Sequence, residues 1–196
     1  MKRTNKKTRI FVISGPSGCG KTTLIDKLLK SDKIKDTFVK VVTATTRQPR
    51  KGEKDGKDYI FLSKSDFLKK KNRNWFIETK EFSGNLYGTP VKYISMARKE
   101  GKDVLFCIDV EGALKIKQLY PAQAVLIFIY PPSEEELTRR LKGRGSEPED
   151  IVKKRLRIAK SEVKYSIHYT YGIINDAVFA AVQRLKTIIL AERLKI

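Results

Sequence analysis

Short apolar runs separated by polar segments organise this chain. Four of them, at residues 10–13, 38–42, 104–108 and 125–129, are rich in β-branched or aromatic side chains, which is typical of buried strands. Helical patterns lie between the first two runs, at 21–30, and between the last two, at 111–119. This alternation predicts a parallel sheet with helices on both faces, in which the carboxyl ends of the strands share one edge.

Two segments depart from the alternation. Residues 43–92 contain a turn-rich stretch at 52–58, short strand-like pieces at 59–62, 76–79 and 82–83, and a helical pattern at 65–71. They predict a small mixed lobe inserted into the sheet domain. Residues 133–160 are polar and helical, begin with a capping box at Ser133 and contain a break at 143–148, which predicts two helices that form a mobile lid.

Composition narrows the class of protein. The 196 residues suit a single domain, and the longest apolar run, 124–130, is far shorter than the roughly 20 residues of a membrane span. The net charge of +20 comes from basic residues scattered along the chain without interleaved aromatics, so no specific nucleic-acid binding is expected. Two cysteines, Cys19 and Cys107, and the absence of a secretory pattern favour a cytoplasmic location.

The segment from Gly15 to Thr22 reads G-x-x-x-x-G-K-[ST] and lies between the first strand-like run and a helical pattern. A phosphate-binding P-loop requires this context. Its glycines let successive N–H groups turn toward phosphate oxygens, and the helix adds the positive end of its dipole. Lys21 would reach the β- and γ-phosphates, and the Thr22 hydroxyl would bind Mg²⁺. The segment therefore predicts a nucleoside triphosphate site.

Arginines supply further candidates for phosphate binding. Arg47 and Arg50 flank Pro49, whose fixed φ would help both guanidinium groups to face one anion; alternatively they are two surface arginines in a loop. A second set lies in the polar helical segment and comprises Arg139, Arg140, Arg144 and Arg155. Arg140 and Arg144 are four residues apart and share a face if the helix extends that far; the alternative is a solvated helix face.

Glu78 ends the apolar piece Phe76-Ile77 and is the candidate for base recognition. A carboxylate accepts two parallel N–H bonds from the N1 and N2 edge of guanine, whereas adenine lacks that pair of donors. Thr89 offers a hydroxyl, and Tyr59 and Tyr87 offer phenolic donors to a phosphate.

Taken together, these stretches resemble guanylate kinase over about residues 9 to 190. The run Thr-Thr-Arg-x-Pro-Arg followed by Gly-x-Asp-Tyr is highly specific to that family. The matching stretches are Ile13-Ser14-Gly15-Pro16-Ser17-Gly18, Thr45-Thr46-Arg47-Gln48-Pro49-Arg50, Gly52-Glu53, Gly56-Lys57-Asp58-Tyr59, Phe82-Ser83-Gly84-Asn85, Tyr87-Gly88-Thr89, Ile108-Asp109, Pro131-Pro132-Ser133, Leu141-Lys142-Gly143-Arg144-Gly145 and Asn175-Asp176.

The resemblance implies an α/β fold with a P-loop NTPase-type parallel sheet flanked by helices (9–42, 93–132 and 161–196), a GMP-binding lobe (about 43–92) and a helical lid (about 133–160). It implies phosphoryl transfer from Mg²⁺-ATP to GMP, and to dGMP, for purine nucleotide metabolism and GMP recycling. The residues implied for ATP are Gly15, Pro16, Ser17, Gly18, Cys19, Gly20, Lys21, Thr22, Thr23 and Asn175, with Thr22 on the metal and Asn175 near the adenine. Those implied for GMP are Thr43, Arg47, Arg50, Tyr59 and Tyr87 at the phosphate and Glu78, Thr89 and Asp109 at the guanine or its surroundings. The implied catalytic set is Lys21, Arg47, Arg140, Arg144 and Arg155.

Two positions depart from the family's pattern. Cys107 stands where relatives often have Asp, and strand alternation would place it on the same side as Asp109, so support for Mg²⁺ would be weaker. The thiol is expected to be buried and inert; the alternative is a redox switch. Glu111 stands where relatives usually have Gln and adds a negative charge near the site.

The sequence is also compatible with other functions. One alternative is a different nucleoside-monophosphate kinase, or a kinase of a phosphorylated sugar. Another is a guanylate-kinase-like module that binds a phosphorylated peptide, although such modules typically lose the P-loop lysine or the lid arginines. A third is a basic nucleic-acid-binding protein. The sequence does not indicate an oligomeric state.

Overall fold

The computed structural model describes residues 8–31, 34–143 and 149–195. The strands are β1 (Ile10–Ser14), β2 (Phe38–Lys40), β3 (Ala44–Thr45), β4 (Ile60–Phe61), β5 (Phe76–Phe82), β6 (Asn85–Pro90), β7 (Asp103–Cys107), β8 (Ala124–Tyr130) and β9 (Tyr171–Ile174). The α-helices are α1 (Lys21–Leu29), α2 (Lys64–Asn72), α3 (Lys92–Glu100), α4 (Val110–Leu119), α5 (Glu134–Lys142), α6 (Glu149–Lys164) and α7 (Val178–Leu194). Short 3₁₀ turns cover Lys35–Thr37 and Tyr165–His168.

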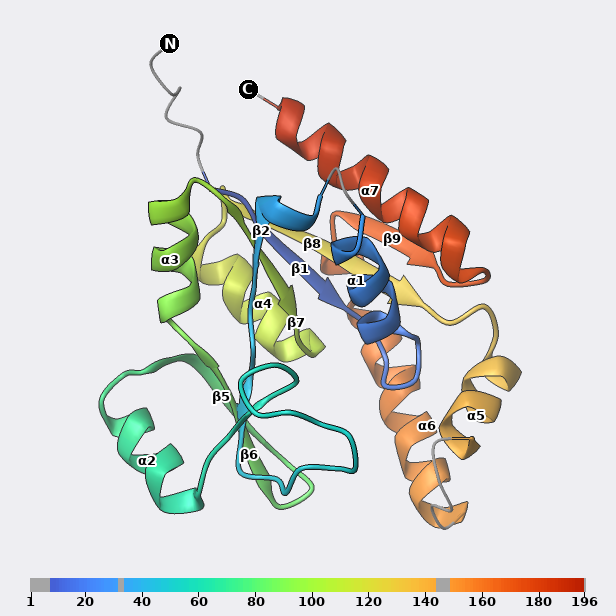
Figure 1. Cartoon of the computed structure of the whole chain (residues 1–196). Helices are drawn as coiled ribbons and strands as arrows, with labels where there is room; N and C mark the ends of the chain where they lie inside the picture. Colours follow the sequence, from blue (N-terminus) through green and yellow to red (C-terminus); the bar gives the residue numbers. More distant parts are fainter. Residues whose placement is uncertain (1–7, 32–33, 144–148, 196) are drawn as a thin grey trace. The chain divides into compact units, whose positions relative to one another are not determined.

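The strands form two sheets, as the apolar pattern predicts. One has five strands in the order β2-β7-β1-β8-β9, and the other has four in the order β4-β3-β6-β5 (Figure 1). β1 pairs in parallel with β8, and β8 pairs in parallel with β9. The predicted α/β class with a parallel sheet flanked by helices and a separate mixed lobe is therefore confirmed.

The chain divides into two compact units, which we call the P-loop unit (9–37 and 105–195) and the Arg47 unit (38–104). In the P-loop unit, α1 and α7 lie side by side on one face of the sheet and α4 lies on the other (Figure 1). β1 is fully buried, as expected for a central parallel strand. α5 and α6 share a small apolar core of Leu137, Leu141, Val152 and Ala159, with Leu156 packed against it.

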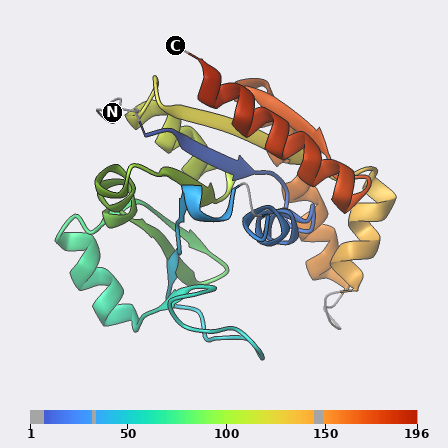
Figure 2. The same ribbon diagram turned by 45° about the horizontal axis from the view of Figure 1, so that its top comes forward.

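The Arg47 unit is built around the β5–β6 hairpin, beside which α2 lies (Figure 2). β5 is one continuous strand rather than the two pieces predicted at 76–79 and 82–83. It continues because the chain turns only at Ser83 and Gly84, both with positive φ, before it returns antiparallel as β6. The rings of Phe67 in α2 and Phe76 in β5 stack 4.5 Å apart over Gly88 of β6. A Cβ at Gly88 would lie 2.7 Å from the Phe76 ring, so this packing requires glycine.

Candidate active site

The P-loop connects the carboxyl end of β1 to the first turn of α1, as the sequence predicts. Gly15 has φ of 139°, and a Cβ there would lie 2.3 Å from the carbonyl oxygen of Ile129 on the neighbouring strand. Gly20 is the N-cap residue of α1 with φ of 95°, and no side chain caps this helix. The first N–H groups of α1 are thus left without intrahelical partners at the positive end of the helix dipole, an arrangement suited to an anion.

Lys21 opens α1 and folds back over the loop. Its Nζ donates to the carbonyl oxygens of Gly15 and Pro16, at 2.6 and 2.9 Å. The first turn of α1 carries no acidic residue. Thr22 and Thr23 follow in the same turn, and both are exposed. The ammonium group is therefore held by neutral carbonyls. Phosphate oxygens could replace these acceptors without breaking an ion pair.

Two of the predicted lid arginines lie at the P-loop. Arg155 of α6 donates through Nη2 to Ser17 Oγ at 2.7 Å. Nη1 of Arg140 lies 3.9 Å from where a Cβ on Gly20 would be. α5 ends at Lys142 and Arg144 lies outside the described residues, so the shared helix face of Arg140 and Arg144 stays a prediction.

Glu136 fixes the direction of Arg140. Its carboxylate accepts from Arg140 Nε at 2.7 Å and from Nε and Nη2 of Arg139, which projects outward from the same helix. Hydrogen bonds from Arg139 and Arg140 lower the pKa of Glu136 from 4.5 to about 2. The carboxylate therefore stays ionised at any physiological pH and keeps Arg140 in place.

In the Arg47 unit, the predicted phosphate contacts gather around one guanidinium group. Nη1 and Nη2 of Arg47 each donate to the carboxylate of Glu53, at 2.9 Å. The Arg47 guanidinium also lies 5.1 Å from the centre of the Tyr59 ring, and Tyr59 meets Tyr87 edge-on at 6.3 Å. Glu53 therefore fixes the orientation of the Arg47 guanidinium. This favours bidentate binding of a further oxyanion through the Nε edge of Arg47.

The same carboxylate also shapes the loop, because Glu53 accepts from the backbone N–H of Arg50 at 2.7 Å. The bond from Arg47 lowers the pKa of Glu53 below 4.5 and raises that of Arg47. A carboxyl with a lowered folded pKa stabilises the fold above its unfolded pKa, and this contribution is lost as pH falls through the folded value. The ion pair is therefore complete at neutral pH and is lost only below about pH 4.5.

Replacing Glu53 with glutamine is expected to raise the KM for the acceptor phosphate about tenfold, because Arg47 loses one charge-assisted hydrogen bond and its fixed direction. The KM for the triphosphate donor should stay within about twofold of the unmodified protein. Steady-state kinetics with each substrate varied in turn measures both constants. Glu100→Gln, which breaks an exposed pair with Lys102 in the same unit, is the matched control. Equal acceptor KM values for the two variants would show that Glu53 does not contribute to acceptor binding.

Of the predicted base contacts, β6 carries Thr89, on the same face as the phosphate contact Tyr87, and β5 carries Glu78. Tyr87 and Thr89 are two residues apart, so their side chains share one face of the strand, while Gly88 faces the Phe67–Phe76 stack. Thr89 Oγ1 donates to Glu78 Oε1 at 2.5 Å, directly across the β5–β6 ladder. A register shift between Phe76 and Glu78 marks a bulge beside this pair. The Glu78 carboxylate is thus held in place two residues along the sheet from Tyr87.

The remaining predicted residues are positioned as follows. Thr43 is half-buried and its carbonyl accepts from Ile60 N, while Arg50 is exposed. Asp109 is the N-cap of α4, and its Oδ1 accepts from Gly112 N at 2.9 Å. β7 ends at Cys107, so strand alternation does not relate it to Asp109. Cys107, the last residue of β7, is half-buried rather than buried as predicted.

Thr22 is the residue that the sequence predicts as a ligand of Mg²⁺. Within residues 8–31, 34–143 and 149–195, no group of three or more His, Cys, Asp or Glu side chains is arranged to hold a metal ion. The hydroxyl of Thr22 is exposed in the first turn of α1, next to Lys21. This fits an ion that is bound mainly by phosphate oxygens and water and takes only one or two ligands from the protein.

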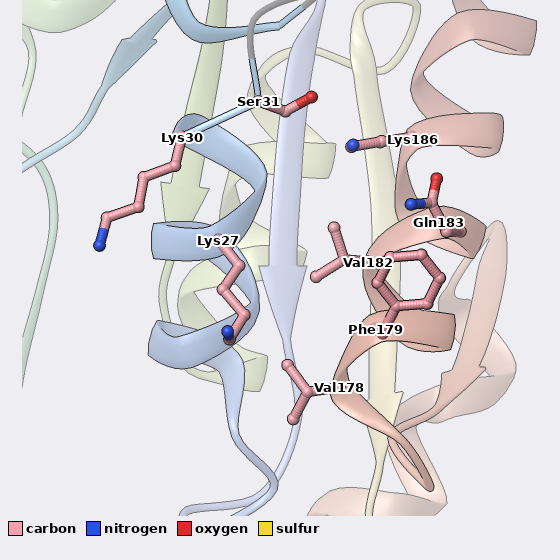
Figure 3. A pocket seen from close by; sticks show the side chains of 8 residues that line it. All are labelled: Lys27, Lys30, Ser31, Val178, Phe179, Val182, Gln183 and Lys186. Atoms are coloured by element: carbon pink, nitrogen blue, oxygen red, sulfur yellow. The ribbon is translucent and has the colours of Figure 1, made fainter.

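A shallow cavity of about 390 Å³ lies elsewhere in the P-loop unit, between α1 and α7 (Figure 3). It is lined by Lys27, Lys30, Ser31, Val178, Phe179, Val182, Gln183 and Lys186. None of these is a predicted site residue, and its lysines come from the carboxyl-terminal end of α1 (Lys27 and Lys30) and from α7 (Lys186) rather than from the P-loop. The candidate site residues lie instead at the P-loop in this unit and, in the Arg47 unit, at the group of Arg47, Tyr59 and Tyr87, which we call the Arg47 cluster.

The roles of Glu53 and Glu136 were missed by the sequence analysis. Glu136 precedes Arg139 and Arg140 by three and four residues on a helix, a spacing that indicates ion pairs. Glu53 lies six residues after Arg47 in a loop, where no periodicity relates two side chains. Only Glu136 could therefore have been found from spacing.

Comparison with known proteins gives one consistent result. The family model for guanylate kinase matches residues 7–192. The guanylate kinase of Desulfitobacterium hafniense (strain Y51) is 43% identical over 188 residues, covering 95% of this chain and 92% of that protein. The guanylate kinase of Clostridium acetobutylicum is 44% identical over 192 residues, covering 98% and 90%. The crystal structure of guanylate kinase from Anaplasma phagocytophilum is 35% identical, covers 98% of this chain and 90% of its own, and superposes with a TM-score of 0.79. Within the described residues, no helix is long and apolar enough to cross a membrane.

Proposed function

Because the chain belongs to the guanylate kinase family and is an ATP:GMP phosphotransferase, we propose that its P-loop unit holds the ATP donor and its Arg47 unit the GMP acceptor. In this proposal, residues about 43–92 form the GMP-binding lobe, about 133–160 the lid, and 9–42, 93–132 and 161–196 the core. dGMP is a second acceptor. The reaction serves purine nucleotide metabolism in the cytoplasm, where these substrates are used.

The donor side of the proposal is carried by the loop from Gly15 to Thr23. Backbone N–H groups of the loop bind the phosphates, Lys21 moves from the carbonyls of Gly15 and Pro16 to the phosphate oxygens, and Asn175 lies near the adenine. Arg140, Arg144 and Arg155 neutralise charge on the transferred phosphoryl group. The bond from Arg155 to Ser17 supports this assignment, because it brings one of these arginines to the loop.

The acceptor side is carried by the Arg47 cluster. Arg47, with Thr43, Arg50, Tyr59 and Tyr87, binds the GMP phosphate, and Glu78 with Thr89 binds the guanine edge, with Asp109 nearby. One observation carries this assignment: Tyr87, which contacts Tyr59, and Thr89, which donates to Glu78 of the neighbouring strand β5, share one face of β6. A single face thus offers a phosphate site at one position and a guanine-selective carboxylate two residues further along.

We propose that Mg²⁺ binds with ATP through the hydroxyl of Thr22. When bound, the ion neutralises charge on the β- and γ-phosphates. No protein group needs to act as a general base, because the attacking oxygen of GMP is already ionised. The chain's own residues therefore act by binding, orienting and neutralising charge, and the lid excludes water.

The test is ADP release from Mg²⁺-ATP with GMP, dGMP, AMP, UMP and dTMP supplied as separate acceptors. We expect turnover with GMP and dGMP to exceed turnover with the other three at least about a hundredfold in kcat/KM, because only guanine offers two N–H donors to Glu78. Higher turnover with AMP or dTMP would refute the assignment of the base site. No turnover with any acceptor would instead favour a phosphopeptide-binding module.

A further inference from the structure

Asn175 is a buried polar residue that reaches the P-loop from the end of the sheet. It follows β9, is 1% exposed, and is anchored by its own backbone N–H, which donates to the carbonyl of Tyr130 at 2.9 Å. Its side-chain Nδ2 donates to the carbonyl oxygen of Cys19 at 2.8 Å. The strand end therefore clamps a specific peptide group of the loop, 156 residues earlier in the sequence.

The clamped group is the peptide that joins Cys19 to Gly20. Because a trans peptide is planar, its C=O and its N–H point in opposite directions. When Asn175 holds the Cys19 carbonyl on one side, the N–H of Gly20 must point to the other. Gly20 is the N-cap of α1, where backbone N–H groups are available to bind phosphate. A reversed peptide would instead direct a carbonyl oxygen toward the phosphates.

Packing around Gly20 shows how close this contact is. A Cβ on Gly20 would lie 2.4 Å from Asn175 Nδ2, so the amide rests directly on the loop backbone. The backbone carbonyl of Asn175 also accepts from Arg140 Nη2 at 3.4 Å. One residue therefore contacts both the P-loop and a lid arginine.

The amide does not gain a full set of hydrogen bonds in this position. Asn175 Oδ1 is buried and has no hydrogen-bond partner among the described residues. A buried acceptor without a partner destabilises the fold. The hydrogen bond from Asn175 Nδ2 to the Cys19 carbonyl is therefore the interaction that requires an amide side chain at this position.

We propose that Asn175 is a positioning residue that sets the orientation of the Cys19–Gly20 peptide, and thereby the affinity of the P-loop for the triphosphate whatever base it carries. The inference rests on the proposal that the P-loop holds the triphosphate of ATP. It differs from a contact with adenine, because a base contact affects only nucleotides that carry that base.

Asn175→Asp tests the clamp, because the two side chains have the same shape. An ionised carboxylate cannot donate to the Cys19 carbonyl and repels it, whereas a protonated carboxyl can donate. Burial should raise the pKa of this carboxyl above its usual value, while the guanidinium of Arg140, which donates to the backbone of residue 175, opposes that shift. We expect affinity for ATP and for inorganic tripolyphosphate to fall about tenfold or more at pH 8. As pH falls through the pKa of the carboxyl, the affinity of the variant should approach that of the unmodified protein at the same pH. Calorimetric titration of both ligands between pH 5 and 8 measures this.

Asn175→Ser is the second variant, because its hydroxyl is too short to replace the amide. It should lose affinity for both ligands without recovery at low pH, and it carries the test if Asn175→Asp does not fold. Asn85→Asp is the matched control: it removes an Nδ2 bond to the backbone carbonyl of Ser83 in the Arg47 unit and should leave both affinities unchanged.

Two results would overturn the inference. Weaker ATP binding with unchanged tripolyphosphate binding would mean that Asn175 acts on the adenine. Unchanged binding of both ligands by folded variants would mean that the clamp is structural only. By contrast, an unmodified protein that binds neither ligand would contradict the proposed function of the P-loop itself, so the two failures are distinguishable.

Discussion

Lys21→Met is expected to lower kcat by about a hundredfold to a thousandfold, since removal of one preorganised group that stabilises transition-state charge has an effect of that size. The reason lies in how the ammonium group is held. Its partners in the loop are the carbonyls of Gly15 and Pro16, so it can transfer to phosphate oxygens without leaving a carboxylate unpaired. Methionine keeps most of the length and the apolar stem of the side chain but removes the charge. Steady-state ADP release with saturating GMP measures the loss.

Lys27→Met is the matched control for this prediction. Lys27 lies on the same helix, is exposed, and follows Lys21 by six residues, which is less than two turns. It should leave kcat within about twofold, because a surface lysine outside the site contributes little. If Lys21→Met and Lys27→Met had similar kcat values in folded protein, Lys21 would not be the group that neutralises the transferred phosphoryl.

Glu78→Gln is expected to reduce the preference for GMP over AMP, as a ratio of kcat/KM values, by about a hundredfold or more. The carboxylate offers two acceptor oxygens to the N1 and N2 donors of guanine, whereas the amide offers one acceptor and one opposing N–H. Thr89, which donates to Glu78 Oε1, can still donate to the amide oxygen, so the β5–β6 ladder should remain intact. The KM for ATP should be unchanged, because Glu78 belongs to the other unit.

Glu81→Gln separates this effect from a general change in charge. Glu81 is on the same strand, three residues further along, and is exposed. Its substitution removes one negative charge from β5 without touching the Glu78–Thr89 pair. An equal loss of GMP preference in both variants would show that the field of the strand, rather than the Glu78 carboxylate, selects the base.

Much of the fold could be predicted because its signals are local. β1, β8, α1 and α4 were found within one or two residues, since buried parallel strands are continuous apolar runs and the helices between them keep a 3.6-residue pattern. The β5–β6 hairpin was less clear. Its second strand carries Tyr87-Gly88-Thr89-Pro90, which lacks a strong strand pattern, and it pairs because Gly88 admits the Phe67–Phe76 stack.

The sequence by itself determined the phosphate-binding loop and the candidate arginines. A P-loop is defined by spacing along the chain, because the same eight residues provide the glycines, the lysine and the hydroxyl. The tertiary structure decided which distant groups complete the site. Arg155 reaches Ser17 across 138 residues and Asn175 reaches Cys19 across 156, because strand order and helix packing bring them together. No periodicity encodes such contacts, since they depend on where whole elements lie rather than on the spacing of residues within one element.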